Sequence, residues 1–269
     1  MDEISPSPDS PKTNPWMVST LVLAGIIIGF GVSQIPAFKI EGGTQQAAVV
    51  KPQKQVEAQK KEPENKALTA EQIAKLPDDD TVIGDPNAPI AFVEFSDFQC
   101  PYCARFFKTT LPLIEENYIK TGKVKLIYRD FPIGGHAQAE LTAQTAECAD
   151  EQGKFRQMHD LLFREQESWA GNEDALKLMK EYAKKLGLDA KQFNECLDSK
   201  KYASEVRKDL VDGATSGISG TPGFFVNGKI ISGAMPYEEV FKPVFEAELA
   251  GKKWELQFDA LGNPSVSSK

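Results

Sequence analysis

Two cysteines separated by two residues follow closely on an apolar run, and this arrangement constrains the fold more than any other feature. The apolar run covers 90–95, Cys100 and Cys103 come next, and a helix-like segment over 104–120 follows. The free amides and the dipole at a helix start stabilise a thiolate, so Cys100 should be acidic and nucleophilic. Cys103, one turn later on the same side, can attack a mixed disulfide. Because a strand precedes the motif, the sequence favours a redox pair over the metal site that Cys-x-x-Cys alone also allows.

The composition fits one folded domain with appendages. The chain has 269 residues, of which 41% are hydrophobic and 26% are charged, which suits one globular domain of about 180 residues. Its formal net charge of −8, with lysines and glutamates interspersed, argues against a nucleic-acid-binding surface. We expect no nucleic-acid partner, no metal and no cofactor.

Residues 16–38 predict a transmembrane anchor behind a short N-terminal tail, residues 1–15. The stretch from Trp16 to Val32 is almost wholly apolar and is long enough to cross a bilayer core, which takes about 17–25 residues. A cleaved secretory signal is the alternative. The apolar stretch is long for such a signal, and the leading segment is acidic rather than basic. The sequence therefore favours an uncleaved helix that anchors the protein in the membrane.

Residues 39–80 have the composition of a flexible linker. They are rich in Lys, Gln, Glu, Pro and Ala, and they contain few aromatic or branched apolar residues. Such a segment cannot bury enough apolar surface to offset the entropy that ordering it would cost. The linker would hold the folded unit, residues 81–252, away from the membrane, and residues 253–269 form a C-terminal tail.

The hydrophobic pattern of the folded unit changes from strands to helices and back to strands. A strand–helix–strand pattern comes first, and apolar residues at three- and four-residue spacing then continue from 135 to 217. Asn227-Gly228 between two apolar runs is a strong signal for a two-residue hairpin. The order predicts an α/β protein with a thioredoxin fold that is interrupted by an all-helical insertion. The expected elements are strands over 81–84, 90–96, 124–131, 223–226 and 229–233, and helices over 104–120, 136–150, 154–165, 173–186, 190–199, 201–216 and 237–249. Pro101 fits the first helical position of the first of these helices, where its missing N–H costs nothing.

Three further residues are expected around the cysteine pair. In a thioredoxin fold the loop before the third core strand faces the Cys-x-x-Cys helix, and here that loop contains Thr221 and Pro222. We expect Pro222 to be cis, which only about 5% of X-Pro bonds are. Thr221 would expose backbone groups that pair with an extended substrate segment. Glu94 should be buried with a raised pKa and could relay a proton to or from Cys103; a hydrogen-bonded structural Glu is the alternative.

The other two cysteines, Cys148 and Cys196, fall in the helical insert. A structural disulfide between them is the favoured interpretation, with two buried free thiols and a four-cysteine zinc site as alternatives. A structural disulfide requires an oxidising compartment, so the pair indicates a domain outside the cytoplasm. The few basic residues around the anchor would by themselves place the domain in the cytoplasm. The two histidines, His136 and His159, have no neighbouring cysteine and are expected to be structural or surface residues.

Three sequence blocks together resemble the DsbA-type thiol:disulfide oxidoreductases, and more closely their membrane-anchored, BdbD-like bacterial members. The resemblance covers residues 82–249, and its blocks are 94–103, 151–162 and 220–228. It implies that Cys100 is the attacking thiol, that Cys103 is the resolving thiol and that Pro222 is the cis proline.

The resemblance implies a dithiol oxidase anchored in the cell membrane by a single helix, with its catalytic domain on the extracytoplasmic side. It would introduce disulfides into exported proteins that carry free thiols, and a membrane quinone-linked partner of the DsbB or VKOR type would reoxidise it. Tyr102 stands where the family's best-known oxidant carries His, and the dipeptide between the cysteines tunes the reduction potential. A reductase or isomerase of the same fold, and a non-catalytic metal- or peptide-binding module, are the alternatives.

Overall fold

The structure, a computed structural model, describes residues 80–269. The predicted N-terminal tail, transmembrane anchor and nearly all of the linker lie outside the described residues. Within residues 80–269, no helix combines the length and the apolar character that crossing a membrane requires.

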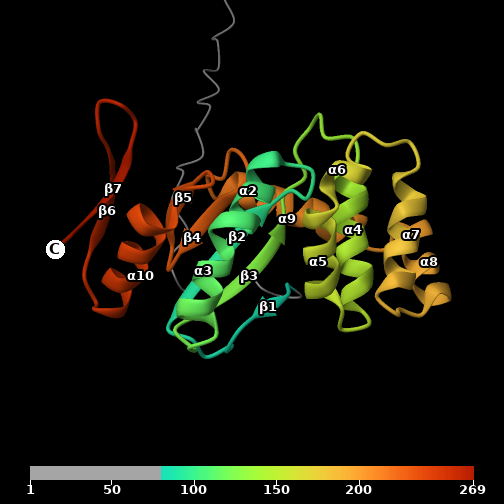
Figure 1. The fold of residues 1–269 in the computed structure, drawn as a ribbon, viewed down its shortest axis with the longest axis horizontal. Helices are drawn as coiled ribbons and strands as arrows, with labels where there is room; N and C mark the ends of the chain where they lie inside the picture. The colour runs from blue at the N-terminus through green and yellow to red at the C-terminus, as the bar shows by residue number, and fades with distance from the viewer. Residues whose placement is uncertain (1–79) are drawn as a thin grey trace, which may run out of the picture. The chain divides into compact units, whose positions relative to one another are not determined.

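A five-stranded mixed sheet forms the centre of the fold (Figure 1). β2 is the middle strand, parallel to β3 and antiparallel to β4. Every residue of β2 is buried, as expected for a strand that is covered on both faces. The strands lie where the sequence predicted strands, in the spatial order β1-β3-β2-β4-β5: β1 (Val82–Ile83), β2 (Ile90–Ser96), β3 (Val124–Asp130), β4 (Gly223–Val226) and β5 (Lys229–Ser232).

The helix that begins at the cysteine motif is interrupted, whereas the sequence predicted one continuous helix over 104–120. Pro101 occupies the first helical position, as the sequence predicted, and its missing N–H costs nothing there. Pro112 has no N–H to donate to the preceding turn, and the helix breaks at Thr110. The resulting elements are α2 (Pro101–Thr109), α3 (Leu111–Ile114) and the π-helix η2 (Glu115–Ile119).

Aromatic side chains fill the space between one face of the sheet and the helices that cover it. The chain after β5 supplies two of these helices, the π-helix η3 (Tyr237–Phe241) and α10 (Lys242–Leu249), where one helix was predicted. Edge-to-face and offset ring pairs contribute beyond the area that they bury. The ring of Phe92 on β2 lies at the centre of this cluster and contacts the rings of Phe106, Phe224, Phe241 and Phe245.

The chain between β3 and β4 forms only helices and loops, and most of it stands to the right of the sheet in Figure 1. Five of the helices match predicted helices to within three residues at each end, whereas the short α6 was not predicted. The helices are α4 (Ala139–Asp150), α5 (Phe155–Arg164), α6 (Gln166–Trp169), α7 (Ala175–Lys185), α8 (Ala190–Asp198) and α9 (Ala203–Thr215).

Helix α9 lies close against the other face of the sheet. Gly213 allows this approach, because a Cβ at that position would be 2.7 Å from the ring of Phe95. The fully buried Arg129 of β3 donates to Asp209 at 2.5 Å and to Asp212 at 3.2 Å, both on α9. Removing one partner of a buried ion pair costs about 3–5 kcal/mol. These contacts therefore hold the helical insert on the sheet.

The predicted C-terminal tail, residues 253–269, is instead a hairpin of β6 (Trp254–Phe258) and β7 (Pro264–Ser268), seen at the left of Figure 1. Trp254 is buried, and its Nε1 donates to Glu248 of α10 at 2.6 Å. The alternation of apolar and polar residues along β6 was the sequence signal for this strand. The hairpin forms because Trp254 docks on the domain.

Candidate active site

The two cysteines of the motif lie where β2 ends and α2 begins. Cys100 is the N-cap residue of α2, and its backbone N–H donates to the carbonyl of Asp97 at 3.0 Å in the connecting turn. Cys103 lies one turn into the helix. Both side chains are free thiols, and only 3% and 0% of their surfaces are exposed. The fold thus places the two thiols together at a helix start.

The two thiols differ in acidity. The hydrogen bond with the Cys103 thiol lowers the pKa of Cys100 from its ordinary 9.0 to about 6, and the Thr221 side chain and the amides of Cys103 and Tyr102 act in the same direction against burial. Burial raises the pKa of Cys103 well above its ordinary value, and the hydrogen bond to Cys100 and the charges of Cys100 and Glu94 add to this rise. In the reduced protein at neutral pH, Cys100 is therefore the thiolate and Cys103 the thiol.

The Thr221–Pro222 peptide bond is cis and lies beside Cys100. In its protonated form, the Cys100 thiol donates to the carbonyl oxygen of Thr221 at 3.4 Å, although the two residues are 121 positions apart in the chain. Pro222 carries no N–H, so the loop has no backbone donor at that position. β4 begins at the next residue, Gly223, and pairs with β2. This pairing brings the loop to the end of β2 where the cysteine motif begins.

Glu94 is the buried carboxyl group of the site. It lies on β2 with 1% of its surface exposed, and burial raises its pKa from 4.5 to about 7 against smaller opposing effects of Ser96 and Arg156. Its charge contributes to the raised pKa of Cys103, so the carboxyl group lies near that thiol. The Glu94 Oε2 has no hydrogen-bond partner within residues 80–269. A carboxyl group with a pKa near neutrality can give a proton to a thiolate or take one from a thiol.

A match to a known protein family covers most of the residues that the structure describes. A family model described as thioredoxin matches residues 77–244. The chain belongs to the thioredoxin family. Its fold, with five strands and a helical insertion before β4, agrees with that assignment and confirms the predicted fold class.

Several thioredoxin-family relatives carry names that refer to disulfide chemistry. The probable disulfide bond formation protein D of Bacillus anthracis is 34% identical over 172 residues, which are 62% of this chain and 77% of that protein. The structure of oxidised BdbD from Bacillus subtilis has a TM-score of 0.59 and 29% identity, and the match covers 64% of this chain and 94% of that one. The structure of alpha-DsbA1 from Wolbachia pipientis has a TM-score of 0.61 and 26% identity, and the match covers 68% of this chain and 97% of that one. The resemblance to DsbA-type proteins is thereby confirmed.

Two further matches are to much longer proteins. The Na(+)/H(+) antiporters NhaA 3 of Salinispora tropica and NhaA 1 of Salinispora arenicola are 36% and 37% identical to this chain over 172 and 173 residues. The matched region is 64% of this chain and 25% of each antiporter. The chain therefore spans about a quarter of the length of these two relatives.

Two polar residues of this thioredoxin-family site were not predicted. Ser96 follows Glu94 on the same face of β2, and Tyr128 lies opposite Glu94 on β3. Both are buried, and neither hydroxyl group has a hydrogen-bond partner among the described residues. The alternation of side chains along a strand would have identified Ser96. Tyr128 could not be found in this way, because its place depends on the register between two strands.

The second cysteine pair is a disulfide within the helical insert. Cys148 on α4 and Cys196 on α8 are joined, with their Cα atoms 5.9 Å apart and a sequence separation of 48. The structure thus joins two of the predicted residues, Cys148 and Cys196, in the insert. It brings the other five together at the active site: Glu94, Cys100, Cys103, Thr221 and Pro222.

The two histidines have structural surroundings. The Nδ1 of His136 is 2.7 Å from Oδ2 of Asp97, which ties the turn before Cys100 to the loop after β3. His159 lies on α5 among aromatic rings that include Phe98, and burial lowers its pKa. The burial of His159 among aromatic rings and the contact of His136 with Asp97 both agree with the structural role expected for these residues.

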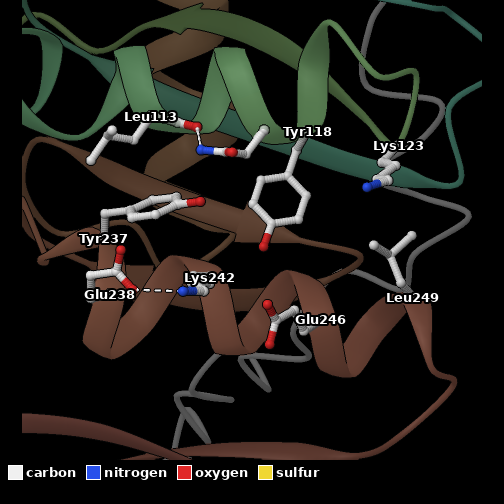
Figure 2. Close-up of a pocket in the computed structure, with 9 residues that line it drawn as sticks. Leu113, Tyr118, Lys123, Tyr237, Glu238, Lys242, Glu246 and Leu249 are labelled. Atoms are coloured by element: carbon white, nitrogen blue, oxygen red, sulfur yellow. Dashed lines mark hydrogen bonds and ion pairs between the residues drawn. The ribbon is translucent and has the colours of Figure 1, made fainter.

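A cavity of about 360 Å³ on another part of the domain contains none of the predicted site residues (Figure 2). It lies between η2 on one side and η3 with α10 on the other, and Tyr118 and Tyr237 project into it from these two sides. Lys242 at the same cavity is paired with Glu238 at 2.8 Å. The candidate active site at Cys100 is therefore separate from this cavity.

Proposed function

We propose that this protein is a membrane-anchored, extracytoplasmic thiol:disulfide oxidoreductase that introduces disulfides into exported proteins. One observation carries the proposed chemistry: two free thiols lie at the start of α2 beside the Thr221 carbonyl, and the pKa of Cys100 is lowered to about 6 while that of Cys103 is raised. A sulfur that is ionised at neutral pH is a good leaving group in thiol–disulfide exchange. This difference makes Cys100 the sulfur that exchanges with the substrate and Cys103 the sulfur that closes the internal disulfide.

The reaction begins from the oxidised enzyme, in which Cys100 and Cys103 form a disulfide. A substrate thiolate attacks Sγ of Cys100, so that a bond between substrate and Cys100 forms and the Cys100–Cys103 bond breaks. The electron pair of the broken bond goes to Cys103, and its raised pKa means that this sulfur takes up a proton. Glu94, whose pKa is about 7, is the proposed proton donor.

The second step releases the product. Another thiolate of the substrate attacks the substrate sulfur of the mixed disulfide, the substrate disulfide forms, and Cys100 leaves as a thiolate, which its low pKa favours. The substrate has then lost two electrons, and the enzyme holds them as a dithiol. A membrane quinone-linked partner of the DsbB or VKOR type would accept these electrons and restore the enzyme disulfide.

Thr221 and Pro222 would position the substrate chain. The Thr221 carbonyl oxygen is 3.4 Å from the Cys100 Sγ, so a segment whose cysteine reaches Cys100 must pass this loop. An extended segment can pair its backbone groups with exposed backbone groups of a protein in the manner of an added strand. We therefore assign substrate positioning to this loop and sulfur exchange to Cys100.

Two features support a position outside the cytoplasm. The Cys148–Cys196 bond is a structural disulfide, a kind of bond that persists mainly in oxidising compartments. The apolar segment over 16–38 has the length of a membrane span. We propose that this segment holds the domain at the cell membrane and that residues 39–80 act as a tether.

The test is the oxidation of a reduced peptide with two cysteines by the oxidised protein, followed by mass spectrometry. We expect one peptide disulfide for each enzyme disulfide consumed, no reaction with Cys100→Ser, and a trapped mixed disulfide with Cys103→Ser. Undiminished oxidation by Cys100→Ser, or no oxidation by the wild-type protein, would contradict the proposal.

The reduction potential distinguishes an oxidase from a reductase or isomerase of the same fold. Known proteins range from about −120 mV for a strong oxidant to about −270 mV for a reductase. A thiolate that is stabilised by its surroundings favours the reduced form, so the low pKa of Cys100 predicts a value toward the oxidising end. Equilibration with glutathione at known ratios measures the potential, and a value near that of a reductase would reverse the proposed direction of electron flow.

A further inference from the structure

Gln166, the first residue of α6, binds the backbone on both sides of Gln99, the residue before the reactive cysteine. Its side-chain Nε2 donates to the carbonyl oxygen of Phe98 at 2.6 Å and to that of Cys100 at 3.1 Å. A side-chain amide has two donor hydrogens and can satisfy two carbonyl groups at once. The contact connects the helical insert to the turn between β2 and α2, across 66–68 residues of sequence.

These two bonds hold the peptide units that set the direction of the Cys100 side chain. Cys100 has φ −71° and ψ 123°, and its carbonyl also accepts the first helical bond, from the N–H of Ala104 at 3.1 Å. A rotation of the backbone that freed this carbonyl would also turn the Cα–Cβ bond of Cys100. The sulfur would then move away from the start of the helix, where the amides of Tyr102 and Cys103 favour its thiolate. Gln166 therefore constrains where the thiolate lies.

The same bonds change the electrostatic surroundings of the sulfur. A carbonyl oxygen carries partial negative charge and disfavours a thiolate close by, and a donor bound to that oxygen offsets part of this effect. Gln166 supplies such a donor to the carbonyl of Cys100 itself and to that of Phe98. It does so without adding a charge of its own.

The rest of the insert keeps Gln166 in place. Trp169, at the other end of α6, is fully buried, and its Nε1 donates to the carbonyl of Leu162 on α5 at 2.9 Å. A second contact reaches the same turn, because the backbone N–H of Gln138 donates to Oε1 of Gln99 at 2.8 Å. Together with the contact of His136 to Asp97, the insert thus holds the active-site turn at three points.

We propose that Gln166 is a positioning residue for thiol–disulfide exchange, through which the helical insert keeps Cys100 in its reactive orientation and stabilises its thiolate. The inference rests on the proposed function, because it assigns the insert a part in the reactivity of the same sulfur. The proposal predicts an effect that a merely structural contact would not have. A negative charge at position 166 should destabilise the Cys100 thiolate, and a positive charge there should stabilise it.

Three substitutions in the full-length protein test this consequence. Gln166→Leu removes both donors, Gln166→Glu replaces them with a negative charge, and Gln166→Lys keeps a donor and adds a positive charge. The ultraviolet absorbance of the thiolate, followed against pH in the reduced protein, gives the acid dissociation constant of Cys100. We expect this constant to fall about 3-fold for Gln166→Leu and about 10-fold for Gln166→Glu, and to rise for Gln166→Lys.

Gln192 is the matched control in the same insert. Its Nε2 donates to Oε2 of Glu151 at 3.2 Å, a contact that does not involve the active-site turn. Gln192→Glu and Gln192→Lys should therefore leave the Cys100 titration unchanged. Shifts of the same sign in Gln166→Glu and Gln166→Lys, or no shift in any variant that thermal unfolding shows to be folded, would overturn the proposal. A wild-type protein that fails to oxidise peptides would instead refute the proposed oxidase, because the titration uses no substrate.

Discussion

The protein holds two cysteine pairs in opposite chemical states. Cys100 and Cys103 lie one turn apart and are free thiols, whereas Cys148 and Cys196 are joined across two helices. All four residues are buried, with at most 5% of their surfaces exposed. Burial alone therefore does not distinguish a reactive thiol from a structural disulfide.

The two pairs differ in their position along the helices that carry them. Cys100 caps the start of α2, where the free amides and the positive end of the dipole favour a thiolate. Cys148 and Cys196 each lie in the last turn of a helix, α4 and α8, where the free groups are carbonyls and the dipole is negative. The same residue type is thus a free thiol with a lowered pKa at a helix start, and part of a disulfide near two helix ends.

Replacing cysteines in one pair and then in the other should give the largest contrast. Cys100→Ser should reduce peptide oxidation to the uncatalysed rate, because serine cannot form the disulfide that exchanges. The double variant Cys148→Ser with Cys196→Ser should retain the rate per folded enzyme, because it leaves the surroundings of Cys100 unchanged. Comparable loss of activity in both proteins would show that the insert disulfide takes part in the reaction.

The same double variant should lose stability rather than activity. A disulfide that closes a loop of 48 residues contributes about 2–4 kcal/mol to the free energy of unfolding, so we expect Tm to fall by about 5–10 °C. Thermal unfolding of the oxidised wild type and the double variant measures this difference. An unchanged Tm would mean that other contacts already hold α4 and α8 together.

Glu94, beside the reactive pair, should make the folded protein less stable as the pH rises. Its pKa is about 7 in the folded protein and 4.5 ordinarily, so between these values the folded protein keeps a proton that the unfolded chain has lost. The stability from this group is complete below pH 4.5 and is lost as the pH rises through 7. At about 1.4 kcal/mol for each pKa unit, the loss is about 3 kcal/mol.

Glu94→Gln should remove this loss, so that its free energy of unfolding depends less on pH than that of the wild type. Urea unfolding below pH 4.5 and above pH 7 measures the difference. Glu116→Gln serves as the control, since Glu116 is exposed and pairs with Lys120 on the surface. If Glu94→Gln and the control respond alike, the carboxyl group of Glu94 does not have a raised pKa.

The most direct test of the comparison concerns the two thiols of the active pair. In the reduced protein, alkylation of Cys100 should reach half its maximal rate near pH 6, while Cys103 stays unmodified. Because the pKa of Cys100 is lowered from 9.0 to about 6, the stability that it gives to the reduced protein is complete above pH 9 and is lost as the pH falls through 6. A half-maximal rate near pH 9 would show that the Cys103 thiol and the other groups around Cys100 do not stabilise its thiolate.

Local patterns predicted the elements that depend on a few neighbouring residues. The Asn227-Gly228 turn has φ values of 45° and 93° at its two residues, a backbone that Asn and Gly adopt readily, and the hairpin of β4 and β5 follows. Prediction failed at a single proline and at a strand signal that was not used. Pro112 breaks the helix after the cysteine motif, and the alternation of apolar and polar residues along β6 belongs to a hairpin, where a tail was predicted.

By itself, the sequence determined where the reactive sulfur would be, because strand, cysteine and helix start are consecutive in the chain. Only the tertiary structure decided which groups surround that sulfur. Thr221 and Gln166 reach Cys100 from 121 and 66 residues away, and Tyr128 lies opposite Glu94 only through the register of β2 and β3. These neighbours depend on how distant elements pack against one another, which short-range periodicity and spacing do not encode.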